Sequence, residues 1–365
     1  MKLAKYLSGP CVLLALCATP ASADILVGFA GPMTGPRAWS GQQFQRGAEQ
    51  AVADINTRGG VLGQRLVLVV GDDASDARQA EAVARKLVAD GVSLVIGHRS
   101  SDMTRAAAPI YAAAGIVQIT PSSTNPALTE QGWRTFFRVC GRDDQQAVLA
   151  ADYLHREWSD KAIGIIHDHS SYGEGLASYT RELLNEKGTT ETLFTGFDPG
   201  KLDYSDLLAE VERLGIDVLY TGAYSAESAL ILRQARDAGL DFQLVSGDAL
   251  HNSDFWLIAD RAAIGAQFTF DIDPRTRPEA ESVVQRFRAV DYEPEGYTIH
   301  TYAALQVWAQ AVERAGSLDA VKVSEAIREH SFDTVLGELE FDDRGDLTRH
   351  DYAWYLWREG EPERQ

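Results

Sequence analysis

Short apolar runs alternate with amphipathic segments along most of the chain, and this alternation constrains the fold more than any other feature. The first apolar run covers residues 25–30, and residues 41–57 follow it with apolar side chains spaced to share one helical face. The alternation continues with strands expected at 66–70, 94–96 and 116–119 and helices expected at 77–89 and 103–114. This order is typical of a parallel α/β sheet.

A second series of the same kind begins after Cys140. We expect strands at 162–166, 191–194, 218–221 and 242–246. The helices expected around them are 145–156, 175–187, 205–214 and 226–238. Beyond Asp271 we expect helices at 279–290, 297–315 and 321–330, a hairpin across 337–346 and a last apolar stretch at 352–357.

Two similar series predict an α/β protein with two doubly wound parallel-sheet lobes. No Pro-, Ser- or Gly-rich linker separates the series, which favours several short hinge crossings over one tether. The expected N-terminal lobe combines residues 24–141 with 272–352. The expected C-terminal lobe combines residues 142–271 with 353–365.

The first 23 residues have the pattern of an export signal. Lys2 and Lys5 supply positive charge, residues 6–16 are mostly apolar, and Ala21-Ser22-Ala23 fits the small-residue cleavage rule. The apolar run is shorter than the roughly 20 residues of a permanent membrane anchor. We therefore expect a mature chain that starts near Asp24.

Charge and cysteine content narrow the possible partners and cross-links. The chain has 53 acidic against 34 basic residues, a balance that repels phosphate backbones, so we expect no nucleic-acid partner. Cys11 and Cys17 lie in the expected signal, so Cys140 alone remains and no disulfide can form within the mature chain.

Hydroxyl-rich loops follow the expected strands of the first lobe. Residues 97–104 follow one strand, and residues 120–126, which include Ser122, Ser123 and Thr124, follow another. Ligands of open parallel sheets bind beyond the carboxyl ends of strands, where helix N-termini carry unpaired N–H groups. These loops either cap helices or hold a carboxylate through N–H and O–H groups together.

The corresponding loops of the second lobe carry Tyr172, Tyr224 and Asp248. Two tyrosines and a carboxylate that face a hydroxyl cluster suit a small zwitterion whose ammonium pairs with Asp248. Each of the three also has a structural interpretation, because loop tyrosines commonly pack and an aspartate can cap a helix.

Several segments together resemble the periplasmic leucine/isoleucine/valine-binding proteins, the amino-acid receptors of ABC importers with a type I two-lobe fold. The segments are GAEQAVADIN (47–56), GDDASDARQA (71–80), VIGH (95–98), YGEGLA (172–177), ILRQARDAGL (231–240), TYAALQ (301–306) and FDDRGDL (341–347). The resemblance implies a periplasmic protein that captures a branched-chain or other small amino acid by two-lobe closure. It also implies a membrane permease as partner, a monomer and no cofactor.

The resemblance further implies roles for individual residues. Ser101 matches the serine that binds the ligand's α-carboxylate, aided by the backbone N–H of Thr124. The Ser122 carbonyl and the Thr124 hydroxyl face the α-ammonium. Asp248 stands where the branched-chain receptors carry a glutamate for that ammonium.

Other positions form the implied ligand-binding wall. Tyr172 and Tyr224 match the second-lobe residues that close over the ligand. Trp39 or Ser40 replaces a tyrosine of the family's pocket, and Tyr297 could complete this wall.

Two departures from the family pattern matter. Ser75 and Ser100 stand where the branched-chain receptors carry a disulfide, so that cross-link is absent. Arg99 occupies a position that is usually apolar. If Arg99 points inward, it needs an anion, and the ligand could carry a second carboxylate or another acceptor. If it points outward or pairs with Asp102, the pocket stays neutral, and we expect this structural pairing.

Other function classes find less support. A hydrolase needs a nucleophile beside a base, and His98 lies near Ser100 as His169 lies near Ser170, but no G-x-S-x-G elbow is present. His167 and His169 form a poor metal site because the sequence shows no third ligand nearby. We expect neither catalysis nor a bound metal. A sensor module for an amide, urea or organic acid that feeds a regulator is the alternative to the transport role.

Overall fold

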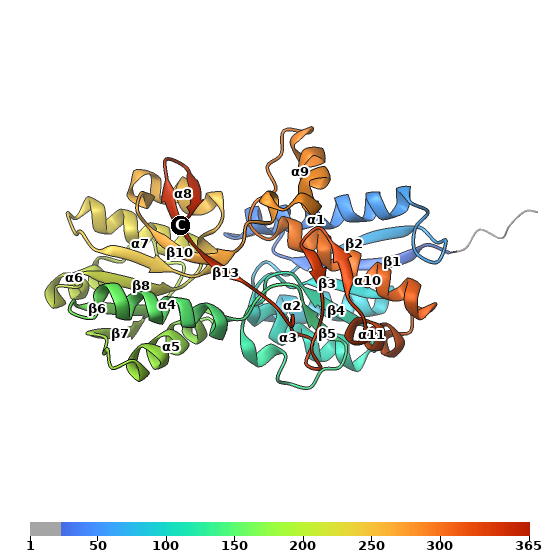
Figure 1. Ribbon diagram of the computed structural model, residues 1–365, viewed down its shortest axis with the longest axis horizontal. Helices are drawn as coiled ribbons and strands as arrows, with labels where there is room; N and C mark the ends of the chain where they lie inside the picture. Colours follow the sequence, from blue (N-terminus) through green and yellow to red (C-terminus); the bar gives the residue numbers. More distant parts are fainter. Residues whose placement is uncertain (1–22) are drawn as a thin grey trace, which may run out of the picture.

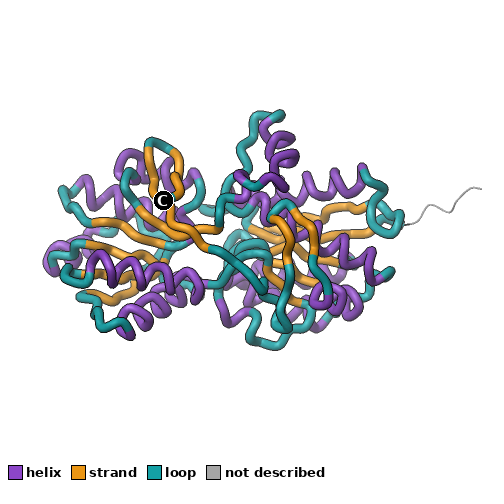
Figure 2. The backbone as a smooth tube through the Cα atoms, viewed as in Figure 1, coloured by secondary structure: helices purple, strands orange, loops and turns teal. Residues whose placement is uncertain are grey.

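The computed structural model describes residues 23–365, so all but the last residue of the expected signal segment lies outside the described part. The described chain forms two lobes that lie side by side, each with a central sheet between helices (Figure 1). Figure 2 shows strands in the middle of each lobe and helices on the outside.

A five-stranded, fully parallel sheet forms the core of the first lobe, in the order β2-β1-β3-β4-β5. Its strands are β1 (Ile25–Gly31), β2 (Leu66–Asp72), β3 (Leu94–Gly97), β4 (Val117–Thr120) and β5 (Phe136–Arg138). The chain reverses its direction of winding between β1 and β3, and such a switch point is where doubly wound sheets bind ligands.

Helices cover both faces of this sheet. On one face, α1 (Ala38–Thr57), α10 (Thr298–Ala315) and α11 (Ala320–Glu329) share a core with strand residues such as Val27. On the other face, α2 (Ala77–Asp90) and α3 (Ser101–Ala113) pack around a separate apolar cluster. Helix α2 begins where the Asp76 side chain accepts the N–H of Gln79, which satisfies one unpaired donor of the first turn.

The second lobe repeats the same winding. Its seven strands have the order β14-β13-β10-β9-β8-β6-β7, so the five parallel strands repeat the sequence seen in the first lobe. The parallel strands are β6 (Ile163–His167), β7 (Leu193–Gly196), β8 (Val218–Gly222), β9 (Gln243–Ser246) and β10 (Gln267–Asp271). Two antiparallel strands, β13 (Tyr352–Arg358) and β14 (Glu361–Arg364), extend this sheet beyond β10.

Helices also flank the second sheet. Helices α4 (Asp143–Trp158) and α5 (Ser171–Glu186) pack together over β6 and β8. The remaining helices of this lobe are α6 (Ser205–Leu214), α7 (Ser225–Asp237) and α8 (Ser253–Ala259), whereas α9 (Glu281–Arg288) contacts α1 of the first lobe through the ion pair of Arg286 with Asp54. No helix among residues 23–365 has the length and hydrophobicity needed to cross a membrane.

The chain crosses between the lobes three times: after β5, after β10 and before β13 (Figure 1). The buried Asp271 carboxylate joins these crossings, because its two oxygens lie 2.5 Å from His300 Nε2 and 2.7 Å from His350 Nε2. Gly141 belongs to the first crossing, and a Cβ atom there would overlap the His350 ring. The three crossings therefore pack against one another around Asp271.

The expected α/β architecture is confirmed, with corrections. The second sheet is mixed rather than wholly parallel, because β13 and β14 run antiparallel. The expected hairpin across 337–346 is present only as a single antiparallel bridge between Phe341 and Leu347, and the longer ladder joins β11 (Phe332–Thr334) to β12 (Gly337–Leu339). The turn between Phe341 and Leu347 is held by the Asp342 carboxylate, which accepts three backbone N–H groups. Cys140 is buried and forms no disulfide within the described residues.

Candidate functional site

Loops at the carboxyl ends of the parallel strands of both lobes meet at a small cavity of about 20 Å³. Phe44, Arg99, Ser101, Ser122, Tyr172, Tyr224, Asp248, Ala249 and Tyr297 line it. Seven of the nine residues expected at the site are therefore brought together around one space. A volume of this size holds little more than one water molecule, so an amino acid enters only if the lobes separate or the lining side chains move.

Asp248 lies two residues after the end of β9 and is the charged hydrogen-bond acceptor of the cavity. Its Oδ1 accepts hydrogen bonds from Gln146 Nε2 at 2.8 Å and from the Tyr172 hydroxyl at 2.9 Å, and its Oδ2 accepts one from the Tyr297 hydroxyl at 2.6 Å. All three donors are neutral, and no cationic side chain within the described part of the chain forms an ion pair with Asp248. A buried carboxylate in this position suits a cation brought by a ligand.

A second buried carboxyl group, that of Asp143, lies beside Asp248 and shares its hydrogen-bond donor Gln146. Asp143 is fully buried in the first turn of α4 and accepts a hydrogen bond from Gln146 Nε2 at 2.9 Å. Burial and then the charge of Asp248 raise the pKa of Asp143 well above its usual range. Burial also raises the pKa of Asp248, against the opposing effect of its hydrogen bonds. A positively charged group in the cavity would favour the ionised form of both carboxyl groups.

The first lobe supplies hydroxyl groups opposite Asp248. Ser101 is the first residue of α3, and its Oγ accepts the N–H of Asn125 at 3.3 Å. The Ser122 hydroxyl donates to the carbonyl of Arg99 at 2.8 Å. Thr124 is completely buried behind these residues, and its carbonyl accepts the N–H of Asp143 at 3.0 Å. The N-terminus of α3 adds unpaired N–H groups and partial positive charge, which suit a carboxylate.

Aromatic side chains form the rest of the wall. The rings of Tyr172 and Tyr224 lie 5.0 Å apart, and the Tyr224 hydroxyl has no hydrogen-bond partner among residues 23–365. Phe44 packs edge-on against Tyr297 with ring centroids 6.1 Å apart. Phe44 was missed as a site residue because its place on the apolar face of α1 predicts only a core position. Ala249 carries no sequence signal beyond its neighbour Asp248.

Arg99 does not form the structural pairing that we expected. Asp102 pairs with Arg105 at 3.0 Å and accepts the N–H of Ser171, while the Arg99 side chain lies against the cavity. The physical reason is that Arg99 precedes the N-terminus of α3 and Asp102 follows it, so the Asp102 carboxylate faces the next turn, where Arg105 lies.

Trp39 is not among the cavity-lining residues, which corrects its expected place in the pocket. Its ring is 47% exposed, and its indole N–H donates to Ser253 Oγ at 3.2 Å. Ser40 is buried, but its hydroxyl donates to the carbonyl of Arg37 within α1's first turn. The side chain of Trp39 therefore links α1 of the first lobe to α8 of the second.

The histidines considered for catalysis or metal binding lie outside the cavity lining. His98 is completely buried, with Nδ1 2.7 Å from Asp73 and Nε2 3.2 Å from the Tyr111 hydroxyl, as expected for a structural histidine.

The expected lack of a third metal ligand near His167 and His169 is wrong. His167, His169 and Glu174 each place one possible ligand atom within 4.8 Å of the others. Glu174 lies in the first turn of α5, which brings it back toward the loop that carries the two histidines. Two of these three side chains are exposed, and exposed acidic groups of this kind are common without a metal.

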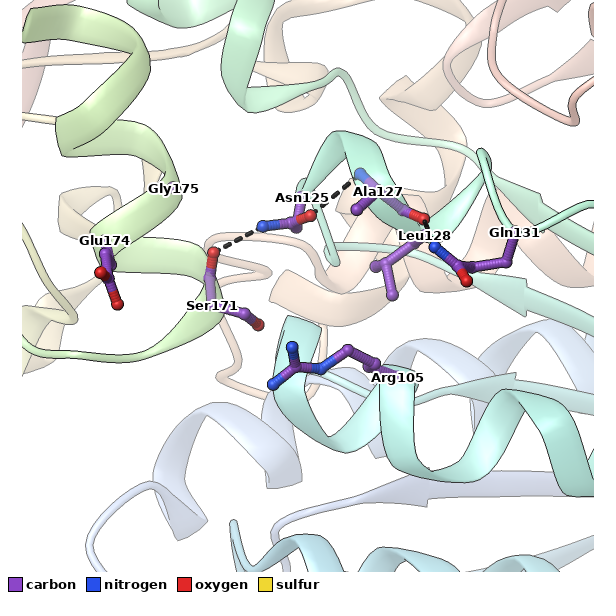
Figure 3. A pocket seen from close by; sticks show the side chains of 8 residues that line it. All are labelled: Arg105, Asn125, Ala127, Leu128, Gln131, Ser171, Glu174 and Gly175. Atoms are coloured by element: carbon purple, nitrogen blue, oxygen red, sulfur yellow. Dashed lines mark hydrogen bonds between the residues drawn. The ribbon is translucent and has the colours of Figure 1, made fainter.

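A separate hollow of about 260 Å³ lies where the lobes meet (Figure 3). Asn125 projects from the first lobe, and its Nδ2 donates to the carbonyl of Ser171 in the second lobe at 2.5 Å. Gln131 Nε2 donates to the Ala127 carbonyl at 3.0 Å within the first lobe. The hollow and the cavity have no lining residue in common, so Asn125 contributes to the contact between lobes rather than to the cavity wall.

Comparison with known proteins agrees with this architecture. A family model described as periplasmic binding protein matches residues 24–361. The Leu/Ile/Val-binding protein homolog 1 of Brucella suis is 44% identical over 339 residues, which cover 93% of this chain and 91% of the relative. The amino acid binding protein of Pseudomonas aeruginosa is 42% identical over 342 residues, covering 93% and 91% of the two chains.

Solved structures show the same two-lobe arrangement. The leucine binding protein LivK of Thermotoga maritima superposes with a TM-score of 0.86 at 27% identity, covering 93% of this chain and 97% of that one. LivJ of Streptococcus pneumoniae, determined in complex with isoleucine, gives a TM-score of 0.84 at 25% identity and covers 94% and 100%. The chain therefore belongs to the periplasmic binding protein family, as a relative of the leucine/isoleucine/valine-binding proteins.

Proposed function

We propose that this protein is the substrate-binding protein of an ABC importer and captures an amino acid between its two lobes. The single observation that carries the proposal is Asp248, a buried carboxylate with three neutral hydrogen-bond donors and no cationic partner within residues 23–365. The hydroxyls of Ser101 and Ser122 share the cavity with it. Relatives described as leucine/isoleucine/valine-binding and amino acid binding proteins support the same assignment.

In this proposal each lobe binds one end of the ligand. The ligand's ammonium pairs with Asp248, and its α-carboxylate is held by the Ser101 hydroxyl and the N–H of Thr124, with the Ser122 carbonyl near the ammonium. Tyr172 and Tyr224 close over the ligand from the second lobe. Because neither lobe alone satisfies both charges, bound ligand stabilises the closed arrangement, and closure is linked to occupancy.

The cellular role in this proposal follows the family. Residues 1–23 direct export and are removed near Ala23, and the mature monomer delivers its ligand to a membrane permease without chemical change. Residues 24–141 with 272–352 form one moving lobe, and residues 142–271 with 353–365 form the other. The membership of β1–β5 in one sheet and of β6–β10 with β13 and β14 in another supports this division.

A thermal-shift screen of the mature protein tests the proposal. The ligands are the standard amino acids and the deaminated acid of each. A ligand present at a hundred times its dissociation constant adds about 2.7 kcal/mol of stability, so binding is visible as a higher melting temperature. We expect at least one amino acid to stabilise the protein and to be recovered unchanged. A screen in which no amino acid shifts the melting temperature contradicts the proposal.

A further inference from the structure

Arg99 is a buried cation without an anionic partner. Its side chain lines the cavity with Ser101 and Asp248, and the residue is 9% exposed. The Nε and Nη1 groups have no hydrogen-bond partner, and the guanidinium forms no ion pair with any carboxylate that the structure describes. A guanidinium removed from water without a partner is costly, so its place in the cavity wall calls for an anion.

The carboxylates of Asp254 and Asp248 lie near enough to act on the Arg99 charge, but neither forms an ion pair with it. The guanidinium of Arg99 lies 5.1 Å from the centre of the Tyr224 ring, a cation–π contact that only partly replaces hydration. Arg37 lies 4.1 Å from the centre of the same ring, and this second cation increases the need for negative charge. The nearest carboxylate to Arg37 is that of Glu227 at 3.9 Å, which serves Arg37 rather than Arg99.

Asp248 is the other charged residue that lines the cavity, and in the proposed function it binds the ligand's ammonium rather than Arg99. Asp248 and Arg99 are not in contact as an ion pair, and Asp248 already accepts three hydrogen bonds. Once an ammonium occupies Asp248, a ligand with an aliphatic side chain places methyl groups against the guanidinium. A ligand with a side-chain carboxylate instead satisfies the unpartnered N–H groups, and arginine binds carboxylates in a two-pronged geometry.

The backbone of Arg99 is held in place, so the side chain cannot easily leave the wall. Its carbonyl accepts the hydroxyls of Ser122 at 2.8 Å and of Ser123 at 3.4 Å, and the chain continues directly into Ser100, the N-cap residue of α3. The guanidinium therefore projects from a fixed point of the first lobe toward Tyr224 of the second. A preorganised group of this kind confers specificity at low entropic cost.

We propose that Arg99 selects ligands with a side-chain carboxylate, so that the captured molecule is a small acidic amino acid rather than leucine, isoleucine or valine. This inference rests on the proposed function, because it assigns the third group of an amino acid whose ammonium and α-carboxylate are already placed. In this arrangement Asp248 binds the ammonium, Ser101 and the N–H of Thr124 bind the α-carboxylate, and Arg99 binds the side-chain carboxylate.

Calorimetry with isosteric ligands tests the inference. The ligands are glutamate and glutamine, aspartate and asparagine, and leucine, each titrated into the wild-type mature protein and into Arg99→Leu. We expect the wild type to bind one of the two acidic amino acids at least roughly 10-fold more tightly than its amide and than leucine, the size of effect that a charged hydrogen bond gives. Arg99→Leu should lower this preference by roughly 10- to 100-fold, and Arg99→Lys should retain part of it.

Arg85→Leu is the matched control, because it removes one positive charge from an exposed position on α2 that pairs only with Glu81. It should leave every ratio of dissociation constants unchanged. A wild type that binds leucine as tightly as the acidic amino acids, or an Arg99→Leu variant with an unaltered preference, overturns the inference and leaves the proposed function standing. If no amino acid binds the wild type, the proposed function itself fails. The wild-type ratios decide the question even if Arg99→Leu does not fold.

Discussion

The hydroxyl of Tyr297 donates a hydrogen bond of 2.6 Å to Asp248 Oδ2, and the two residues belong to different lobes. Tyr297 immediately precedes α10 in the first lobe, whereas Asp248 follows β9 in the second. The Tyr172 hydroxyl, from the second lobe, binds the other carboxylate oxygen at 2.9 Å. The carboxylate proposed to bind the ligand's ammonium is thus held by both lobes, which connects ligand recognition directly to closure.

Replacing Asp248 by Asn should weaken binding of an amino acid by about 1.5–3 kcal/mol, because the ammonium loses its charged partner. The matching deaminated acid has no ammonium and should lose much less affinity. Calorimetry with both ligands measures the difference. Asp241→Asn, at an exposed position in the same lobe, controls for net charge. Equal losses for the two ligands would show that Asp248 is not the ammonium partner.

The variant Ser101→Ala should lower amino-acid affinity through the opposite end of the ligand. The Ser101 hydroxyl lines the cavity, and a hydrogen bond to a carboxylate is worth about 1.5–3 kcal/mol. Binding is measured by calorimetry, with the exposed Ser159→Ala as a hydroxyl-removing control. Unchanged affinity in Ser101→Ala would contradict the carboxylate site.

Asn125→Ala should destabilise the closed arrangement without altering the cavity wall. The variant removes the hydrogen bond from Asn125 Nδ2 to the Ser171 carbonyl in the other lobe, worth about 0.5–1.5 kcal/mol (Figure 3). Apparent affinity should fall by this amount for every ligand alike, because only the population of the closed form changes. Gln131→Ala is the matched control, since its hydrogen bond to Ala127 stays within the first lobe. A loss that differs between ligands would argue against a closure effect.

Asp271 should make stability at the lobe crossings depend on pH. Burial alone raises its pKa, but the charges and hydrogen bonds of His350 and His300 outweigh burial, so the pKa of Asp271 lies well below the usual range. A carboxyl group with a lowered folded-state pKa stabilises the protein above the unfolded-state value of about 3.9, and this stabilisation is lost as the pH falls.

The variant Asp271→Asn isolates this effect. At pH 7 it should lower the free energy of unfolding by about 3–5 kcal/mol, because it leaves buried histidines without their anionic partner. Its deficit relative to the wild type should persist from pH 7 to about pH 4 and shrink only as the pH falls further. Denaturant unfolding at several pH values measures both quantities, with the exposed Asp333→Asn as control. A deficit that is constant with pH would show that Asp271 is not charged in the folded protein.

Hydrophobic periodicity was sufficient to predict most of the fold. The helix expected at 205–214 has the same bounds in α6, and the strand expected at 94–96 differs from β3 by one residue. Hydrophobic periodicity failed for segments whose secondary structure depends on tertiary contacts. β5 has three residues, too few to show a period, and it forms a strand because the edge of β4 is available to pair with it. β10 was also missed, although its sequence QFTFD alternates polar and apolar residues. The turn signal at 342–346 was correct, and the flanking residues Phe341 and Leu347 form a single antiparallel bridge rather than a longer ladder.

The sequence predicts the part of the site that lies in the loops at the carboxyl ends of the strands. Parallel topology places the loops with Ser101, Tyr172, Tyr224 and Asp248 at a common edge, so residue chemistry was enough to select them. Side-chain direction was not predictable: Arg99 lies against the cavity, whereas Trp39 reaches to Ser253. Both outcomes depend on where the second lobe lies when the cleft is closed, and no local pattern in the sequence encodes that.

A crystal structure of the mature protein with the amino acid that gives the largest thermal shift tests the central claim most directly. The account predicts ligand density between the lobes, with the ammonium within about 3 Å of an Asp248 carboxylate oxygen and the α-carboxylate on the Ser101 hydroxyl and the N–H of Thr124. Density at another place, or a ligand in the cavity whose ammonium points away from Asp248, would contradict it.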